Sequence, residues 1–145
     1  MDDLGGASPK KMTGDLMLSV KKILVVEDDD IELELMRMAL ERKGYLVSTA
    51  EDGLEGYERA VVERPDLIIT DVSMPSADGV HLVRRVRDTP DIAETPILII
   101  TGFGSGSATL SLAQGATAYE PKPLDPESLL EAVRRLLPEA RSSSA

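Results

Sequence analysis

The stretch LIITDVSMPSADG, residues Leu67 to Gly79, joins a buried-looking strand to an acid. Its first residues are apolar or small and are typical of a buried strand, but the run stops on Asp71 before the chain breaks at Met74–Pro75. Removing a carboxylate from water is costly unless it has partners. Asp71 is therefore either the first solvated residue of a loop or part of a site at the strand end.

Similar apolar runs occur along the rest of the chain, and a helix-like segment follows each of them. The predicted strands are Lys22–Glu27, Tyr45–Thr49, Leu67–Asp71, Ile97–Thr101 and Thr117–Glu120. Strands that alternate with helices favour a parallel α/β sheet with right-handed crossovers. We therefore expect one α/β domain built on a parallel sheet.

Apolar residues at helical spacing predict the inner faces of several helices. These residues are Leu35, Met36, Ala39 and Leu40 in the first helix; Leu54, Ala60 and Val61 in the second; Leu82, Val83 and Val86 in the third; and Leu129, Leu130, Val133, Leu136 and Leu137 in the last. Asp125 is placed to cap the last helix, with Pro126 at its first position, and Pro65 is expected to close the second. The methionines of these segments are interpreted as core residues.

Composition narrows the class of protein. The chain has 145 residues, a formal net charge of −10 and no cysteine. This length is enough for one domain with a sizeable core, and the negative charge disfavours direct binding to nucleic acid or to an anionic membrane. The absence of cysteine excludes disulfides and fits a reducing cytosol. Because no apolar run has membrane-spanning length and no signal-peptide pattern is present, we expect a cytoplasmic protein.

The two ends of the chain differ in composition from the middle. Residues 1–20 mix glycine, proline, serine and charged residues, and we expect a flexible N-terminal extension with Met1, Met12 or Met17 as the natural start. Residues 21–138 form the predicted domain. Residues 139–145 are interpreted as a disordered tail or a cut linker.

Polar residues stand at the carboxyl ends of the predicted strands. The first strand ends on Glu27 and Asp28, the third on Asp71 and the fourth on Thr101, while Lys122 follows the fifth. Ligands of open parallel sheets bind outside these strand ends. If the strand order is 2-1-3-4-5, the first and third strands are neighbours and the three acids converge. Asp71 then belongs to a site.

The chemistry of such a site favours phosphoryl transfer. Three adjacent carboxylates repel one another, and a hard divalent cation such as Mg²⁺ removes this conflict while keeping some of its water ligands. Lys122 adds a compact positive charge and Thr101 a hydroxyl donor, which together suit a phosphoryl group. Asp71 can itself act as the nucleophile and form an aspartyl phosphate.

Four motifs, KILVVEDD, LIITDVSMPSADG, PILIIT and GATAYEPKPLDPESL, resemble the response-regulator receiver domain of two-component signalling. The resemblance extends from about Lys22 to Leu137. It implies a flavodoxin-like, doubly wound (βα)₅ fold with strand order 2-1-3-4-5. It also implies a domain that accepts a phosphoryl group from a sensor histidine kinase or a histidine phosphotransfer protein and then switches partner binding. Such a domain is not an enzyme acting on other molecules, although it promotes its own phosphorylation and dephosphorylation.

The resemblance assigns roles to individual residues. Asp71 is the implied phosphoacceptor, and Glu27, Asp28, Asp71 and the carbonyl of Ser73 are the implied Mg²⁺ ligands. Lys122 would contact the phosphoryl group.

The remaining implied roles concern switching and phosphate lifetime. Thr101 and Tyr119 would form a switch pair that moves inward when the phosphate arrives, and Ser73 and Phe103 would tune its hydrolysis. Three further positions match the family pattern: Pro75 and Gly79 in the loop after the acceptor, and Pro123 in a Lys-Pro step that is often cis.

The expected output surface is the face of the fourth helix, fifth strand and fifth helix. It would contact an output protein or an output domain outside this sequence, in a monomer or a weak homodimer. The segment GFGSGSATLSLAQ, residues 102–114, departs from the family, which usually places alanine and then a helix here. Its three glycines are expected to keep the entry to the fourth helix loose, so that phosphorylation can bias its order.

Other interpretations stay open at this stage. GFGSGS superficially resembles a dinucleotide-binding turn, although Ser107 stands where the third glycine would fall. An aspartyl phosphatase would need a second acid at Ser73, and a pure interaction module would not need the acids, Thr101 and Lys122. Two acids that follow the cluster, Asp29 and Asp30, are interpreted as the start of the first helix, and His81 as a surface residue.

Overall fold

Five short strands form one parallel sheet in the computed structural model, which describes residues 20–72, 78–102, 109 and 111–137. The strands are β1 (Lys22–Val26), β2 (Leu46–Ala50), β3 (Leu67–Asp71), β4 (Ile97–Thr101) and β5 (Ala118–Pro121). Their order is β2-β1-β3-β4-β5, with every neighbouring pair parallel. The predicted fold and strand order are confirmed, and the predicted strand ends differ by one residue at β1, β2 and β5.

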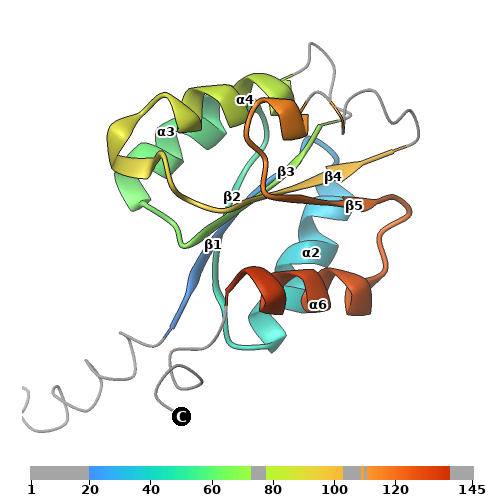
Figure 1. Cartoon of the computed structure of the whole chain (residues 1–145). Coiled ribbons are helices and arrows are strands. Elements are labelled where there is room, and N and C mark those ends of the chain that lie inside the picture. Colours follow the sequence, from blue (N-terminus) through green and yellow to red (C-terminus); the bar gives the residue numbers. More distant parts are fainter. Residues whose placement is uncertain (1–19, 73–77, 103–108, 110, 138–145) are drawn as a thin grey trace, which may run out of the picture.

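Helices cover both faces of this sheet (Figure 1). The helices are α2 (Asp30–Arg42), α3 (Gly53–Glu63), α4 (Asp78–Arg87), the short 3₁₀ helix η2 (Pro90–Ile92) and α6 (Pro126–Leu136). α3 and α4 lie on one face, and α2 and α6 lie on the other. Across the described residues, we find no helix with both the length and the apolar character needed to cross a membrane.

Acidic side chains cap three of the described helices, α2, α3 and α6, at the carboxyl edge of the sheet. Asp29 Oδ1 accepts hydrogen bonds from the backbone N–H groups of Ile31 and Glu32, and Asp52 caps α3 in the same manner. Asp125 caps α6 with Pro126 at the first helical position, as predicted. An N-cap of this kind satisfies N–H groups that lack a partner within the helix. The assignment of Asp29 to the start of the first helix is therefore confirmed.

The core has two layers because both faces of the sheet are apolar. Every residue of β3 and β4 is buried, and α4 and α6 pack through the faces expected from their periodicity. The buried residues that confirm this expectation are Leu82, Val83, Val86, Leu129, Val133 and Leu137.

Three of the predicted core residues are instead exposed. Leu35 is 62% exposed on α2, because that helix contacts the sheet through Met36 and Leu40 and each residue turns about 100° from the next. Leu54 and Val61 are exposed on α3, whose inner face consists of small residues. The core interpretation of the methionines holds for Met36, which is buried, and is wrong for the exposed Met38, which faces away from the sheet on α2.

Candidate functional site

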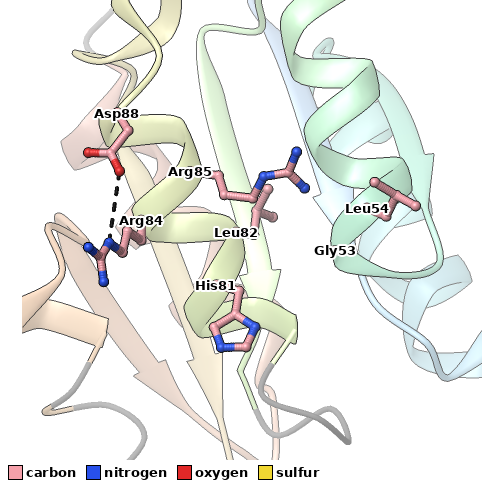
Figure 2. A pocket seen from close by; sticks show the side chains of 7 residues that line it. All are labelled: Gly53, Leu54, His81, Leu82, Arg84, Arg85 and Asp88. Atoms are coloured by element: carbon pink, nitrogen blue, oxygen red, sulfur yellow. Dashed lines mark ion pairs between the residues drawn. The ribbon is translucent and has the colours of Figure 1, made fainter.

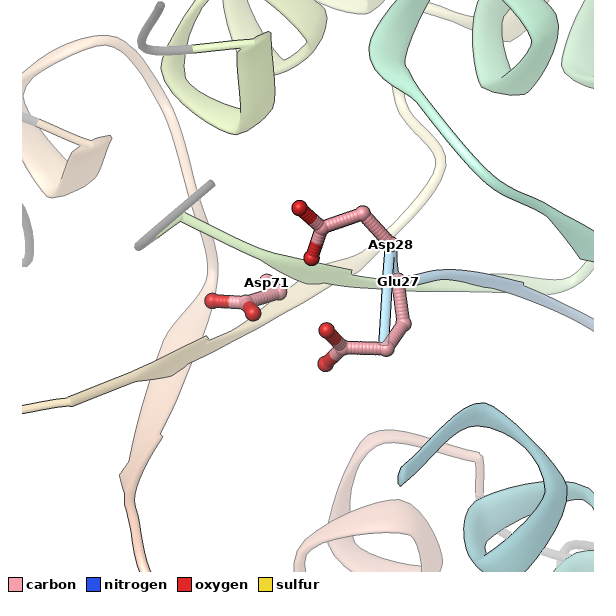
Figure 3. Close-up of side chains that lie close together, drawn as sticks. All are labelled: Glu27, Asp28 and Asp71. Carbon is pink, nitrogen blue, oxygen red and sulfur yellow. The ribbon is translucent and has the colours of Figure 1, made fainter. Parts of the chain in front are cut away.

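Three carboxylates meet where β1 and β3 end side by side. Val26 pairs with Thr70 in the sheet, so that Glu27 and Asp28 follow β1 next to Asp71 at the end of β3. One carboxylate oxygen from each of the three acids lies within 4.8 Å of the others. Figure 3 shows the three side chains turned toward a common point. Glu27 and Asp71 are buried, whereas Asp28 is exposed to solvent.

Lys122 brings a positive charge to the same point from β5. The strand pairing places it there, because the Lys122 backbone N–H donates to the Thr101 carbonyl oxygen at 2.7 Å. Its Nζ atom donates to Asp71 Oδ2 at 2.8 Å and lies 3.6 Å from Glu27 Oε1. The peptide bond to Pro123 is cis, as the family resemblance implied. Four residues singled out in the sequence therefore share one site.

Burial and charge shift the proton affinities of two of these groups. The pKa of Glu27 is raised to about 8, first by burial and then by its hydrogen bond to Asp71 and the charge of that residue. The Asp29 N–H and the Lys122 charge act against this rise. Burial alone would lower the pKa of Lys122, but hydrogen bonds to Asp71 and Glu32 outweigh it and keep the ammonium charged.

The donor set fits a hard divalent cation. Glu27 Oε1 is buried and accepts no hydrogen bond from the described residues. The Lys122 ammonium lies 3.6 Å away, beyond hydrogen-bond distance, so a divalent cation or a proton in front of this oxygen would offset more of its lost interaction with water. Oxygen ligands from a few carboxylates, with room left for water, are the set that Mg²⁺ prefers. Glu27, Asp28 and Asp71 could therefore hold this ion.

The other predicted site residues divide between described and undescribed parts of the chain. Thr101 is buried at the end of β4, and its hydroxyl donates to the Gly102 carbonyl oxygen at 3.2 Å. Tyr119 lies on β5 with 51% of its surface exposed. Ser73 and Phe103, together with Pro75 and residues 103–108 of the glycine-rich segment, lie outside the described residues. Their roles stay predictions.

Two residues near Asp71 have contacts that sequence reasoning did not identify. Glu32 Oε1 lies 2.7 Å from Lys122 Nζ. A side chain at position 79 would collide with the Asp71 carbonyl oxygen and come within 2.8 Å of Val72 Cα, which explains the glycine there in physical terms. Glu32 stands three residues after the Asp29 cap, and this helical spacing is the signal that could have placed it near the strand ends.

A separate groove of about 400 Å³ lies between α3 and α4, and none of the three clustered acids is among its lining residues. Figure 2 shows His81 on α4 and Leu54 on α3 at its walls, with Arg84 paired to Asp88. The guanidinium of Arg85 lies 4.0 Å from the centre of the Tyr57 ring. His81 is exposed, as predicted. This groove brings together no acid–base or metal-binding set comparable to the cluster at the strand ends.

A doubly wound parallel sheet with three carboxylates and a lysine at its carboxyl edge defines the class of domain. Residues 23–134 match the family model described as the response regulator receiver domain. This chain therefore belongs to the response regulator receiver family.

Individual relatives and solved structures agree with this assignment. The response regulator MprA of Mycobacterium ulcerans is 42% identical over 117 residues, which cover 80% of this chain and 50% of the relative. The transcriptional regulatory protein CseB of Streptomyces coelicolor is 38% identical, with 79% and 48% covered. The chain thus spans about half the length of these curated relatives.

Two solved structures of similar length have the same fold. The chemotaxis response regulator CheY4 of Vibrio cholerae aligns with a TM-score of 0.75 and 35% identity, covering 81% of this chain and 99% of the other. A putative response regulator from Chloroflexus aurantiacus aligns with a TM-score of 0.76 and 35% identity, covering 81% and 98%. The fold of this chain is therefore that of a receiver domain.

Proposed function

We propose that this chain accepts a phosphoryl group on Asp71 with the help of Mg²⁺ and thereby switches its affinity for a partner. The observation that supports this proposal most strongly is the convergence of Glu27, Asp28 and Asp71 with the Lys122 ammonium 2.8 Å from Asp71. By analogy to the family, the proposed phosphodonor is a sensor histidine kinase or a histidine phosphotransfer protein, and the proposed two-component pathway is cytoplasmic.

The transfer itself needs a positioned nucleophile and neutralised charge. An oxygen of Asp71 forms a new O–P bond while the N–P bond of the donor phosphohistidine breaks, and the imidazole nitrogen leaves with the electron pair and takes up a proton. Lys122 donates a hydrogen bond to Asp71 now and would donate to a phosphoryl oxygen afterwards. In this proposal the domain promotes its own phosphorylation and dephosphorylation, and it does not catalyse a reaction of another substrate.

Mg²⁺, when bound, would neutralise negative charge on the phosphoryl oxygens. The residues proposed to hold it are Glu27, Asp28 and Asp71, with the carbonyl of Ser73 added by analogy to the family. Glu27 and Asp71 are fixed by the ends of neighbouring strands, so that their oxygens are oriented before a cation arrives. Buried Glu27 Oε1 supports the proposal, because it accepts no hydrogen bond from the described residues and a bound cation would interact with it more closely than Lys122 does at 3.6 Å.

The surface beside the site suits docking of the phosphodonor. Ile31 and Leu35 lie on α2 with 73% and 62% of their surfaces exposed. Ile31 lies in the first turn of α2, directly after the acidic cluster, and we propose that a protein that delivers a phosphoryl group to Asp71 contacts this part of α2. Ile31 and Leu35 are four residues apart and therefore neighbours on the helix surface, where they form a small apolar patch of the kind that contacts a protein partner.

The proposed switch connects Asp71 on β3 to Thr101 on β4 and to Tyr119 on β5. Thr101 is the last residue of β4, and the residue before it, Ile100, pairs with Asp71 of β3. Movement of the Thr101 hydroxyl toward a phosphoryl group would free space for Tyr119 on neighbouring β5, which is now exposed. The output face is accordingly proposed around β5 and α6, and it would contact an output protein or a domain beyond this sequence.

A direct test uses acetyl phosphate as a small phosphodonor. We expect the full chain to acquire one base-labile phosphoryl group that hydroxylamine removes when Mg²⁺ is present, and to acquire none after the metal is chelated. Readdition of Mg²⁺ should restore the reaction, whereas equal ionic strength from NaCl should not. Phosphorylation that proceeds equally in the chelator would contradict the proposal.

A further inference from the structure

Glu32 takes no part in the proposed chemistry, yet its side chain reaches the site. It lies in the first turn of α2, and its Oε1 atom is 2.7 Å from Lys122 Nζ. The same nitrogen is 2.8 Å from Asp71 Oδ2. One ammonium group therefore bridges two carboxylates that belong to different elements of the fold.

The backbone of Glu32 is held in place by the acidic cluster itself. Its N–H donates to Asp29 Oδ1 at 3.0 Å, and the Asp29 N–H donates to Glu27 Oε2 at 3.1 Å. These two hydrogen bonds connect the start of α2 to the residue that follows β1. The carboxylate of Glu32 thus approaches Lys122 from a fixed position.

We propose that Glu32 is a positioning residue that holds the Lys122 ammonium in the unphosphorylated protein and competes with an incoming phosphoryl group for it. The proposal rests on the proposed function of Asp71. An ammonium group has three N–H donors, and Asp71 and Glu32 occupy two of them. A phosphoryl group that reaches Asp71 needs a share of the same positive charge, and the carboxylate of Glu32 also repels it.

The ion pair between Glu32 and Lys122 is partly exposed to solvent, so its contribution to the free energy is modest. The side chain of Glu32 is 40% exposed and that of Lys122 is 20% exposed. Exposed ion pairs contribute roughly 0.2–1 kcal/mol, and because Lys122 is mostly buried we take the upper part of this range, about 0.4–1 kcal/mol, which corresponds to a change in affinity of about two- to fivefold. Loss of the Glu32 contact should therefore change the affinity for an anionic phosphodonor within this range.

Two variants of the full chain separate the contact of Glu32 with Lys122 from the charge of Glu32, and a third variant serves as a control. Glu32→Gln removes the charge, and Glu32→Asp keeps it on a side chain that is one methylene shorter. Glu34→Gln is the matched control, because Glu34 lies on the same helix and accepts a hydrogen bond from Arg37 at 3.1 Å instead of one from Lys122.

The first measurement is the rate of phosphorylation against acetyl phosphate concentration at saturating Mg²⁺. The O–P bond of the donor breaks and acetate leaves with the electron pair as the Asp71 O–P bond forms. We expect Glu32→Gln and Glu32→Asp to lower the half-saturating donor concentration about two- to fivefold, with a maximal rate near that of the wild type. Glu34→Gln should match the wild type. The proposal would be overturned if the half-saturating donor concentration of Glu32→Gln or of Glu32→Asp equalled that of the wild type. An equal decrease in Glu34→Gln would also overturn it.

The second measurement does not depend on phosphorylation. Acylation of Lys122 by an N-hydroxysuccinimide ester, followed by peptide mass spectrometry, reports how firmly the ammonium is held. We expect faster acylation of Lys122 in both Glu32 variants and not in Glu34→Gln; equal rates in all proteins would overturn the role of Glu32. A wild-type chain that takes no phosphate from the donor would overturn the proposed function of Asp71 and leave this comparison valid.

Discussion

Lys122 is the positively charged residue around which three carboxylates of this site gather. Its Nζ atom lies 2.7, 2.8 and 3.6 Å from oxygens of Glu32, Asp71 and Glu27. A compact ammonium can satisfy this crowded arrangement because its donors spread over a small volume. The guanidinium of arginine is wider and planar, so it cannot occupy the same point between three carboxylates.

Lys122→Arg is therefore not a conservative substitution. We expect the variant to accept phosphate on Asp71 but to leave Thr101 in its unphosphorylated position, because the wider cation cannot follow the phosphoryl oxygen in the same way. Amide chemical shifts around Thr101, recorded before and after phosphorylation, check this outcome. Shift changes as large as those of the wild type would contradict it.

Glu27 and Asp28 should contribute unequally to Mg²⁺ binding. Asp28 is exposed and can meet a hydrated cation directly, whereas Glu27 is buried and already accepts the Asp29 N–H. We expect Asp28→Ala to weaken Mg²⁺ binding about tenfold or more, since a carboxylate and a cation in contact attract by several kcal/mol even with solvent screening. Glu27→Ala should weaken it less. Titration of both variants by calorimetry measures the difference, and equal affinities would be evidence against this division.

At the scale of elements, the start of α4 has to approach the end of β3 closely. Gly79 makes this approach possible, because a Cβ atom there would collide with the backbone of Asp71 and Val72. Gly56 of α3 faces a side chain instead of backbone: a Cβ atom added there would lie 2.9 Å from a methyl carbon of Val26. Side chains can move where backbone cannot, so these two glycines make a matched pair.

Gly79→Ala should destabilise the protein by about 1–3 kcal/mol, the usual cost of forcing extra volume into a packed region. Gly56→Ala should cost less, because alanine regains roughly 1 kcal/mol of helix propensity and the Val26 side chain can shift. Urea denaturation of the two variants gives both values. A Gly79→Ala variant as stable as the wild type would mean that the start of α4 lies farther from Asp71.

The faces of the helices show where sequence patterns stop being sufficient. Periodicity correctly predicted that Leu82 and Leu129 are buried, because α4 and α6 each have a single wide apolar stripe. On α2 and α3 the apolar residues outnumber the positions that touch the sheet, and Leu35 and Leu54 lie on the surface. Spacing alone cannot separate a core leucine from one that is exposed on the surface.

At the scale of the whole molecule, the site could be predicted because the order of the parallel strands determines which strand ends lie side by side. Parallel strands in the order β2-β1-β3-β4-β5 bring Glu27, Asp71 and Lys122 to one edge, although they are far apart in the chain. The Glu32–Lys122 contact was not predicted, since it depends on the rotation of α2 about its axis. Such rotations are set by packing, which single residues do not reveal.

The proposed function of this chain depends most directly on the identity of the phosphoacceptor. Borohydride reduces an aspartyl phosphate to homoserine, so peptide mass spectrometry after phosphorylation with acetyl phosphate and Mg²⁺ locates the modified residue. We expect homoserine at position 71 alone in the wild type and no conversion in Asp71→Asn. Homoserine at another position, or label retained by Asp71→Asn at the wild-type level, would contradict the assignment of Asp71.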